Sequence, residues 1–505
     1  MNDNTQTNDS SALEDIIARK REEVHQLRDA GTDVFPHRLP GPFTFAAEAK
    51  TAQAGTEMSC AGRVTQLRLM GKAAFAHLQD TSGKLQLYFK KDTMGEQPYD
   101  FFKKHVHVGD FIYVSGKMFL THTNEITLAA EKLTLLSKAV RPMPEKWHGI
   151  QDTEIRYRSR HLDLLANTEV RDIFILRSKL VSAIRRTLDA KNFLEVETPI
   201  LCASAGGASA TPFETYLRAL KMPLFMRIAT ELYLKRLIIG GLDRVYEIGR
   251  VFRNEGLDTR HNPEFTTLEL YQAYTDYNGM MQVMEDIFAA CSEVLGKDTV
   301  QYRGIEINLK PPFRRLSLPE AWKEHCGEDI HAILSGKTFN RPALETLAKR
   351  MHVEHGADTP SAKIFDRIFS IKIEPLLEQP TFLMDYPTAI TPLAKLKQGD
   401  PCITERFEFF AAGMEMANAY TELNDPEDQL ERLQEQMRQK QAEHNEEVDV
   451  IDKDFVEAME SGMPPTGGMG VGIDRLAMLF SGNPSIREVI LFPTLKSDAA
   501  EPPAA

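Results

Sequence analysis

The sequence predicts an α+β protein in which a small β-barrel precedes an antiparallel sheet flanked by helices. Two observations support this class. Residues 56–136 contain short segments of alternating apolar and polar side chains, separated by turn sequences, as in the strands of a closed barrel. After residue 150, helix-like and strand-like segments mix, and neighbouring strands are joined by turns, which favours an antiparallel sheet.

The bulk properties are those of a globular protein. The 505 residues suffice for several domains, and 42% hydrophobic and 26% charged residues are ordinary values. No apolar run approaches the ~20 residues that span a bilayer, and the first residues lack a signal pattern, so we expect a cytoplasmic protein without a membrane partner. A formal charge of −13 argues against a surface coated with basic residues, but leaves room for a local basic patch.

The N-terminal segment divides into a tail and a helix. We predict that residues 1–10 are a disordered tail, because they are polar and have nothing to bury. An amphipathic helix follows, with Ser11 as its N-cap, Glu14 completing a capping box and Gly31 ending it. We therefore assign residues 11–55 to this helix and a connection to the barrel.

Residues 56–136 are predicted to form five strands with a helix-like segment at 98–106, which is the pattern of an OB-type barrel. Between residues 62 and 91, basic and aromatic side chains accompany a single acidic residue, Asp80. The basic side chains are Arg63, Arg68, Lys72, Lys84, Lys90 and Lys91. Such a strip suits single-stranded bases and phosphates and indicates an RNA partner. Residues 137–149 contain two prolines and no clear period, so they are predicted to be a linker.

Residues 150–496 are predicted to form the larger domain, with the antiparallel sheet and its helices. We expect two inserts in it, near 316–375 and 426–460. The second insert contains a strongly charged helix, which we interpret as a solvent-exposed face. Residues 497–505 are predicted to be a disordered tail.

Two glycine-containing segments do not fit nucleotide-binding loops, and the cysteines do not fit a disulfide framework or a zinc site. SGKT at 335–338 is not a P-loop, because His331 stands where the first glycine is needed and no apolar strand precedes it. GGMGVGIDR at 467–475 lacks the third glycine of a dinucleotide-binding motif, since Ile473 occupies that position. The five cysteines lie far apart without a Cys/His cluster, so we expect neither a disulfide framework nor zinc.

Isolated charges in apolar surroundings point to phosphate chemistry. Arg253 ends an apolar strand and Arg475 opens an apolar helix. Guanidinium groups bind phosphate with two parallel hydrogen bonds, although a buried arginine paired with a carboxylate is the alternative. Glu408 and Glu415 lie in the apolar segment RFEFFAAGMEM, where a carboxylate must be paired or bound to a metal. Oxygen ligands of this kind suit Mg²⁺ shared with substrate phosphates.

Three motifs occur in order: KNFLEVETPIL at 191–201, FRNEGLDTRHNPEF at 252–265 and GMGVGIDRLAMLF at 468–480. Together with the N-terminal barrel, they make the chain resemble class II aminoacyl-tRNA synthetases and, within that class, the lysyl-tRNA synthetase family. The resemblance covers nearly the whole chain, as far as ILFP at 490–493. It implies a homodimer whose interface includes the first motif with Pro199.

The resemblance implies ATP-dependent activation of L-lysine to lysyl-adenylate with Mg²⁺, followed by transfer to the 3′ end of tRNA(Lys). Arg253 and Arg475 would be the catalytic residues. Arg253 would hold the α-phosphate and the amino-acid carboxylate, while Arg475 and Phe265 would enclose the adenine. Glu408 and Glu415 would hold the metal. The implied ATP site comprises Arg253, Glu255, Arg260, His261, Phe265, Glu408 and Arg475.

The resemblance also implies a lysine pocket built from Gly207, Glu231, Arg253, Glu269, Tyr271, Asn418, Tyr420 and Glu422. Three carboxylates in one cavity repel one another unless cations arrive, and lysine brings two ammonium groups. Glu231 would take the α-ammonium and Glu422 the ε-ammonium. The alternative is that these glutamates are ordinary surface charges. An aspartate pocket would need cations, and this residue set supplies none beyond Arg253.

On the barrel, the residues that the resemblance matches to anticodon contacts are Arg68, Phe75, Gln86 and Glu125. The alternative is a basic face with Phe75 in the core. Two positions depart from the family pattern. Asn192 stands where the first motif often has glycine, and we expect it to tolerate a left-handed turn. Met414 stands where many members carry arginine or lysine.

Three other functions remain to be separated. Aspartyl- and asparaginyl-tRNA synthetases share the barrel and the motifs. A paralogue that attaches lysine to an elongation factor lacks the barrel, so residues 56–136 argue against it. A noncatalytic tRNA-binding module would typically have lost Arg253, Arg475 or a metal carboxylate, and all of these are present.

Overall fold

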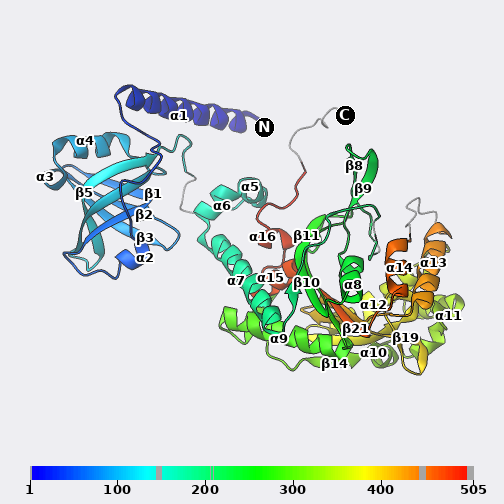
Figure 1. Cartoon of the computed structure of the whole chain (residues 1–505). Helices are drawn as coiled ribbons and strands as arrows, with labels where there is room; N and C mark the ends of the chain where they lie inside the picture. Colours follow the sequence, from blue (N-terminus) through cyan, green and yellow to red (C-terminus); the bar gives the residue numbers. More distant parts are fainter. Residues whose placement is uncertain (1–2, 144–149, 205, 209, 443–450, 497–505) are drawn as a thin grey trace. The chain divides into compact units, whose positions relative to one another are not determined.

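The computed structural model describes residues 3–143, 150–204, 206–208, 210–442 and 451–496. The chain divides into two compact units, Met1–Ile150 and Gln151–Ala505, and each is described by itself (Figure 1). Residues 144–149 of the predicted linker and all of the predicted C-terminal tail lie outside the described residues. No described helix is both long and apolar enough to cross a membrane.

The first unit contains the closed five-stranded barrel, which confirms the OB-type fold. Its strands are β1 (Glu57–Met70), β2 (Ala73–Gln79), β3 (Lys84–Lys90), β4 (Phe111–Leu120) and β5 (Ile126–Ser137). The order is β1-β2-β3-β5-β4, and β3 pairs with β5 in parallel. The short helices are α2 (Ala46–Ala49), α3 (Lys91–Met94) and α4 (Glu96–His105). Phe102 of α4 stacks on Phe89 of β3 with ring centroids 3.9 Å apart, so the helix closes the barrel core.

Helix α1 (Asp3–Asp29) is longer than predicted. Residues 3–10 continue the helix, so the prediction of a disordered tail is wrong for them, as is the N-cap at Ser11. No glycine or proline interrupts residues 3–29, and an early aspartate suits the positive end of the helix dipole. The helix packs on the barrel through Val24 and Leu27.

The second unit is built on a sheet for which nine strands are described. In sheet order the strands are β14 (Arg314–Ser317), β17 (Thr381–Pro387), β19 (Asp400–Ala411), β20 (Met414–Thr421), β21 (Thr466–Gly472), β11 (Glu264–Ala273), β10 (Arg244–Phe252) and β6 (Leu194–Glu195), with β18 (Leu396–Lys397) beside β19. The central pairs are antiparallel, as predicted. The edge pairs β10–β6 and β14–β17 are parallel, because long excursions of the chain separate their strands.

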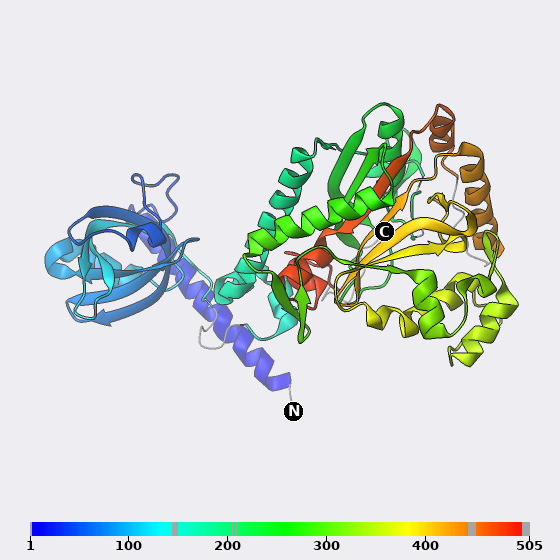
Figure 2. The same ribbon diagram turned by 90° about the horizontal axis from the view of Figure 1, so that it is seen from below.

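The two faces of the sheet bury different helices, because side chains alternate along each strand. Leu268 and Leu270 of β11 face the main core with α7 (Thr168–Ala190), α9 (Tyr277–Leu295) and α15 (Ile473–Ser481). Figure 2 shows α9 crossing the sheet on this side. Tyr271 and Ala273 face the opposite side, where they pack with α8 (Glu231–Ile239). The functional carboxylates lie on the α8 side.

The remaining elements connect or extend the sheet. They are α5 (Thr153–Arg158), α6 (Arg160–Ala166), β7 (Leu201–Cys202), β8 (Glu214–Leu217), β9 (Met222–Met226), β12 (Thr299–Tyr302), β13 (Ile305–Asn308), the 3₁₀ turns η1 (Ile330–Ile333), η2 (Glu374–Leu376) and η3 (Thr388–Ile390), and α16 (Ile486–Val489).

The first insert forms a helical layer with its own core. It contains α10 (Leu318–Cys326), α11 (Arg341–Arg350), α12 (Ser361–Lys372) and the hairpin β15 (Leu334–Ser335)–β16 (Thr338–Phe339). Trp322 and Phe365 stack there with ring centroids 4.8 Å apart. The SGKT segment is the turn of this hairpin, with no strand–loop–helix, in agreement with the exclusion of a P-loop.

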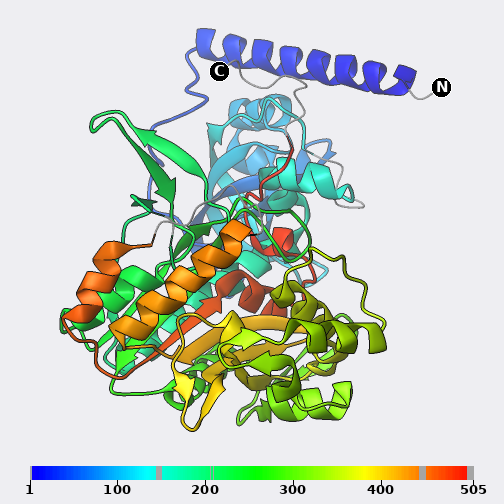
Figure 3. The same ribbon diagram turned by 90° about the vertical axis from the view of Figure 1, so that its right-hand side faces the viewer.

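The second insert contains α13 (Pro426–Ala442) and α14 (Lys453–Glu460), which pack together (Figure 3). The interpretation of α13 as a solvent-exposed face holds for one side of the helix, where Glu427, Glu431 and Arg438 are exposed, but not for the opposite side. Gln429 and Arg432 are buried, and Arg432 donates to the backbone oxygen of Ala394 at 2.8 Å while it pairs with Asp428. Charged side chains on the inner side of α13 can be buried because they have hydrogen-bond and ion-pair partners.

Candidate active site

Two adjoining cavities lie on the α8 side of the sheet. The first, here called the acidic cavity, has a volume of about 360 Å³ and includes Glu231 and Glu269 in its wall. The second, here called the arginine cavity, has a volume of about 370 Å³ and includes Arg260 and Arg475. Arg253, Asn418 and Gly470 line both cavities. A group held at this shared wall can therefore meet occupants of both sides.

Arg253 takes its position from the β10–β11 hairpin. Phe252 pairs with Glu264 at the end of the ladder, and the Arg253 backbone nitrogen donates to the Pro263 oxygen at 2.8 Å. The guanidinium carbon lies 5.2 Å from the centroid of the Phe265 ring, and Nε is 3.4 Å from the Ile228 oxygen. The arginine is thus held by strand geometry and leaves most of its donors for a ligand.

Arg475 is aimed by the start of α15. The neighbouring Asp474 accepts from the Thr266 backbone nitrogen at 2.7 Å and pairs with Arg177 at 2.6 Å, which fixes the first turn against β11. Arg475 donates to the backbone oxygen of Glu415 at 2.7 Å and lies 3.3 Å from His261 Nε2. Its guanidinium therefore forms one wall of the arginine cavity.

The structure brings nearly all of the predicted ATP residues together. Those that line the arginine cavity are Arg253, Glu255, Arg260, His261, Phe265 and Arg475, with Glu415 beside them. Glu408 lines instead a neighbouring cavity of about 690 Å³. It accepts hydrogen bonds from Tyr386 at 2.8 Å and Arg406 at 2.5 Å. Burial raises the pKa of Glu408 to about 7, opposed by Arg406 and reinforced by Glu415.

No group of three or more His, Cys, Asp or Glu side chains suited to a metal occurs in the part of the chain that the structure describes. Glu408 and Glu415 lie on the neighbouring strands β19 and β20, on either side of a bulge. The five cysteines are free, and Cys402 is the one that is not fully buried.

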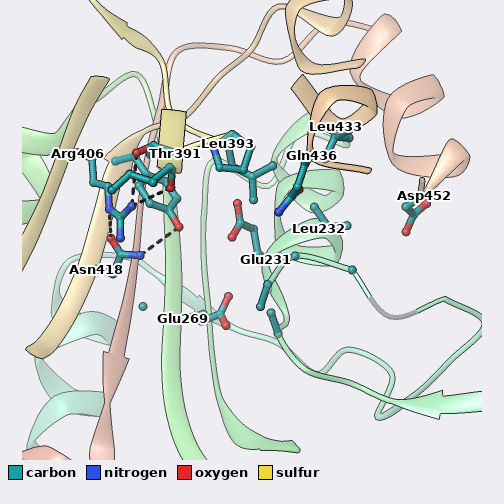
Figure 4. A pocket seen from close by; sticks show the side chains of 18 of the residues that line it. Glu231, Leu232, Glu269, Thr391, Leu393, Arg406, Asn418, Leu433, Gln436 and Asp452 are labelled. Carbon is teal, nitrogen blue, oxygen red and sulfur yellow. Dashed lines mark hydrogen bonds between the residues drawn. The ribbon is translucent and has the colours of Figure 1, made fainter. Parts of the chain in front are cut away.

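The acidic cavity is built from three elements whose side chains converge. Glu231 opens α8, Glu269 and Tyr271 share one face of β11, and Asn418 and Tyr420 share one face of β20. Figure 4 shows Glu231 and Glu269 pointing into the same space, with Arg406 and Asn418 on the other wall. The predicted lysine-pocket residues that line this cavity are Gly207, Glu231, Arg253, Glu269, Tyr271, Asn418 and Tyr420.

Glu269 sits in a poorly solvated part of this cavity. Its carboxylate accepts from the Thr230 backbone nitrogen at 3.3 Å and from the Tyr271 hydroxyl at 3.4 Å. Burial raises the pKa of Glu269 to about 7, and repulsion from Glu231 adds to the rise. A cation that enters the cavity would be favoured, because it would relieve this repulsion.

Glu422 lies behind the cavity wall and is fully buried. It forms an ion pair with Lys235, which the sequence analysis did not single out, and Lys235 also pairs with Glu231 at 2.6 Å. Burial raises the pKa of Glu422 to about 8, although Lys235 opposes the rise. The four-residue spacing of Glu231 and Lys235 on one helix was the available signal.

The glycines of β21 leave room for these side chains. A Cβ atom on Gly468 would collide with Glu422 Oε1 and with the Tyr271 ring, and Gly470 lines both cavities. Residues 467–472 of this motif therefore lie in the central strand β21, paired with β20 and β11, and Ile473 begins α15, in agreement with the exclusion of a dinucleotide-binding loop.

Arg406 corrects one prediction. It lines the acidic cavity, so the statement that the pocket offers no cation beyond Arg253 is wrong. Arg406 donates to Asn418 Oδ1 at 3.0 Å and pairs with Glu408, two residues along the same face of β19. The second insert also contributes wall residues that sequence reasoning missed, namely Leu433, Gln436, Met437, Ile451 and Asp452. For the three residues of α13, the local signal is that one side of this helix is buried.

The barrel residues cluster on one face. Arg68 pairs with Phe75 across β1 and β2, and the Phe75 ring lies 4.9 Å from that of Tyr88 on β3. Phe75 is partly exposed while Ala74 and Ala76 fill the core, so the alternative of a core Phe75 is wrong. Gln86 donates to Glu125 at 2.8 Å. Tyr88 belongs to this face and was missed.

The first motif and the two departures have structural explanations. Asn192 has a φ of 61°, which confirms that it takes the left-handed turn. Met414 is buried next to the Tyr302 hydroxyl and lies in the core. Pro199 lies at the surface near Ile200 and Leu201, whose side chains are 46% and 49% exposed.

Comparison with known proteins agrees with this geometry. The family model described as tRNA synthetases class II (D, K and N) matches residues 152–496, and the one described as OB-fold nucleic acid binding domain matches residues 58–136. A lysine–tRNA ligase of Moorella thermoacetica is 48% identical over 96% of this chain and 98% of its own length. Those of a Thermoanaerobacter species and of Bacillus cereus are 46% identical, over 97% and 96% of this chain and 97% and 98% of their own lengths. The chain therefore belongs to the class II tRNA synthetases and, within them, to the family of the lysine–tRNA ligases.

Proposed function

We infer that this chain charges tRNA with lysine. Lysine and ATP form lysyl-adenylate and diphosphate, and the lysyl group then passes to the 3′-terminal ribose of tRNA(Lys). The observation that carries this proposal is the junction of the two cavities at Arg253, Asn418 and Gly470. An amino acid on the acidic side and a nucleotide on the arginine side would meet there, carboxylate against α-phosphate. The test is which amino acid drives ATP–diphosphate exchange.

Arg253 is the residue best placed to assist this step. From the shared wall, its donors reach both the substrate carboxylate and the α-phosphate, where negative charge accumulates during in-line attack. Asn418 adds a neutral donor on the carboxylate side. No protein base is needed at the reacting atom, because alignment of the two substrates and charge stabilisation supply the catalysis.

The nucleotide would be held by the rest of the arginine cavity. Adenine between Phe265 and Arg475 forms a cation–π sandwich, and Glu255 accepts from its amino group. Arg260 and His261 would contact the outer phosphates. Their exposure at the cavity edge supports this assignment, since the terminal phosphates must leave as diphosphate.

Glu408 and Glu415 fit Mg²⁺, which commonly takes one or two carboxylates together with substrate phosphates. The raised pKa of Glu408 supports this assignment, because a carboxyl that burial deprives of water gains from a nearby cation. When bound, Mg²⁺ would neutralise the charge of the phosphates. Glu415, which lines the arginine cavity, and Glu408, which pairs with Arg406, would hold it.

Lysine recognition follows from the excess of carboxylates in the acidic cavity. Glu231 would take the α-ammonium, and Glu422, with Glu269 and Tyr271, would take the ε-ammonium. The class II family model also covers the enzymes denoted D and N. The similarity to lysine–tRNA ligases and these glutamates favour lysine over aspartate and asparagine. The barrel, which the lysine-attaching paralogue lacks, favours tRNA as acceptor.

Discrimination against ornithine is expected to be finite. Ornithine has both ammonium groups but one methylene fewer, and a methylene provides only ~1–3 kcal/mol. We expect ornithine-dependent ATP–diphosphate exchange with a kcat/KM about 10- to 200-fold below that of lysine. Aspartate serves as the control and should give no exchange above background. Equal use of lysine and ornithine, or exchange driven by aspartate, would contradict the pocket assignment.

The barrel face is proposed to bind the anticodon through Arg68, Phe75, Gln86 and Glu125. Phe75→Ala removes a stacking surface worth ~1–3 kcal/mol per base, so the KM for tRNA in aminoacylation should rise about ten-fold or more. Lysine-dependent ATP–diphosphate exchange without tRNA should be unchanged. Phe101→Ala is the matched control, because this ring packs on His105 of α4 rather than on the strand face. An unchanged KM for tRNA in Phe75→Ala would remove the ring from the interface.

We propose a homodimer formed through the first motif and a cytoplasmic location. The exposed apolar side chains Leu194, Ile200 and Leu201 beside Pro199 support the interface, because contiguous apolar surface of this kind marks contact sites. The translation role of the family supports the location. Light scattering of Leu201→Glu would test the interface, since a buried charge should give monomers.

A further inference from the structure

Lys235 is a fully buried cation in the substrate-recognition part of the protein. Its ammonium group contacts Glu231 at 2.6 Å on the same helix and Glu422 on the far side of the wall. Its side chain has no exposed surface, and its ammonium lies 5.9 Å from the centroid of the Phe455 ring of α14. The nucleotide chemistry described above does not use it.

The groups that face Glu422 come from α8, β11 and β20. They are Lys235, Glu231, Glu269, Tyr271 and Tyr420. The two tyrosines are neutral, because burial raises the pKa of each hydroxyl well above its ordinary value. The three carboxylates carry three negative charges when ionised, Lys235 offsets one, and two remain. Arg253, whose charge acts on Glu269, is assigned to the substrate carboxylate, and Arg406 is paired with Glu408, so neither is counted in this balance.

Two unbalanced negative charges match the two ammonium groups of a lysine substrate. Without Lys235, three buried carboxylates would share the space, and such groups retain a proton instead of ionising together. A proton on Glu422 would remove the acceptor for the ε-ammonium, and the substrate would have to displace that proton to bind. The carboxylates also hold Lys235 in its charged form, since their attraction raises its pKa despite the effect of burial.

We propose that Lys235 is a positioning residue for lysine recognition, a resident counter-ion that pairs with Glu231 and Glu422, favours the ionised form of Glu422 and leaves the ionised pocket short of two positive charges. This inference rests on the proposed function and deepens it. Lys235 does not touch the reacting atoms. It decides in what charge state the recognition carboxylates meet the substrate.

The test is the pH dependence of kcat/KM for lysine in ATP–diphosphate exchange, measured for Lys235→Met and Lys235→Gln. Wild-type kcat/KM should fall as pH falls through the range from 8 to 7, where Glu422 and Glu269 take up protons. In both variants the pH at which kcat/KM for lysine falls should be higher by about one pH unit or more, because Lys235 no longer lowers the pKa of Glu422. At pH 7 we expect a loss of about ten-fold in kcat/KM for lysine, recovered at higher pH, with the KM for ATP within about three-fold.

The two variants separate charge from packing. Lys235→Met preserves the apolar part of the side chain, and the amide of Lys235→Gln can still hydrogen-bond the carboxylates. If Lys235→Met lowers the thermal unfolding midpoint too far, the result for Lys235→Gln decides the test. Arg236→Met, which removes the neighbouring half-buried cation of α8 that lines neither cavity, is the matched control and should leave the pH dependence unchanged. An unchanged pH dependence in Lys235→Gln, or equal losses for lysine and ATP, overturns the proposal. If the wild type activates another amino acid instead of lysine, the proposed function fails, and this outcome is distinct from failure of the Lys235 proposal.

Discussion

Arg253→Ala should abolish lysine-dependent ATP–diphosphate exchange, with a loss of about three orders of magnitude or more. Loss of one preorganised donor to a developing negative charge costs about 10²–10³ in rate, and Arg253 lines both cavities, in which the two reactants are proposed to bind. A thousand-fold loss corresponds to about 4 kcal/mol of transition-state stabilisation. The measurement is kcat/KM for lysine and for ATP, and both should fall.

Two companion variants make this result specific. Arg253→Lys keeps a positive charge but loses the planar pair of donors, so its exchange rate should lie between those of the wild type and Arg253→Ala. Arg315→Ala removes an exposed arginine on β14, outside both cavities, and should behave as wild type. Near-normal exchange by Arg253→Ala with an unchanged unfolding midpoint would discard the assignment of this residue.

Glu422→Gln should raise the KM for lysine about 100-fold or more while the KM for ATP stays within about three-fold. Removal of one partner from a buried charged pair costs ~2–5 kcal/mol, in part because the other charge is left unpaired. Here the loss falls on the substrate ε-ammonium and on Lys235, which keeps Glu231 as its remaining partner. The thermal unfolding midpoint of the free enzyme should therefore also fall.

The contrast between the two substrates decides the role of Glu422. Glu306→Gln removes an exposed carboxylate on β13 and should leave both KM values unchanged. If Glu422→Gln raised the KM values for lysine and ATP equally, Glu422 would be a structural residue and the ε-ammonium would need another acceptor. Glu269, two residues from Tyr271 on the same strand face, would then be the candidate.

The barrel and the sheet could be predicted in outline because strand alternation is a local property. Phe75 and Ala74 occupy opposite faces of β2 for this reason, and the helix-like segment before β4 is α4. The helix start could not be predicted in the same way. Residues 3–10 are polar and compatible with either state, and helical continuity through residue 29 decided the outcome.

Most of the nucleotide side of the candidate site could be predicted residue by residue, because its arginines and aromatic residue lie in the second and third motifs. Arg253 and Phe265 lie in one motif and Arg475 in another, far along the chain, yet all three line one cavity, as the resemblance implied. The direction in which the Glu408 side chain points could not be predicted in this way. Whether its carboxylate faces the arginine cavity or Arg406 depends on pairing within β19 and on packing against Tyr386.

The amino-acid sequence by itself determined the two-domain α+β architecture and the order of the motifs, because these depend on residue type and short-range spacing. The family resemblance implied which carboxylates converge in the proposed lysine pocket. Only the tertiary structure decided which charges are compensated. It buried Lys235 between Glu231 and Glu422, brought Arg406 into the acidic cavity and packed α13 over its edge. The reason is physical: the cost of a charge depends on its burial and its partners, and both are set by contacts between segments distant in the chain.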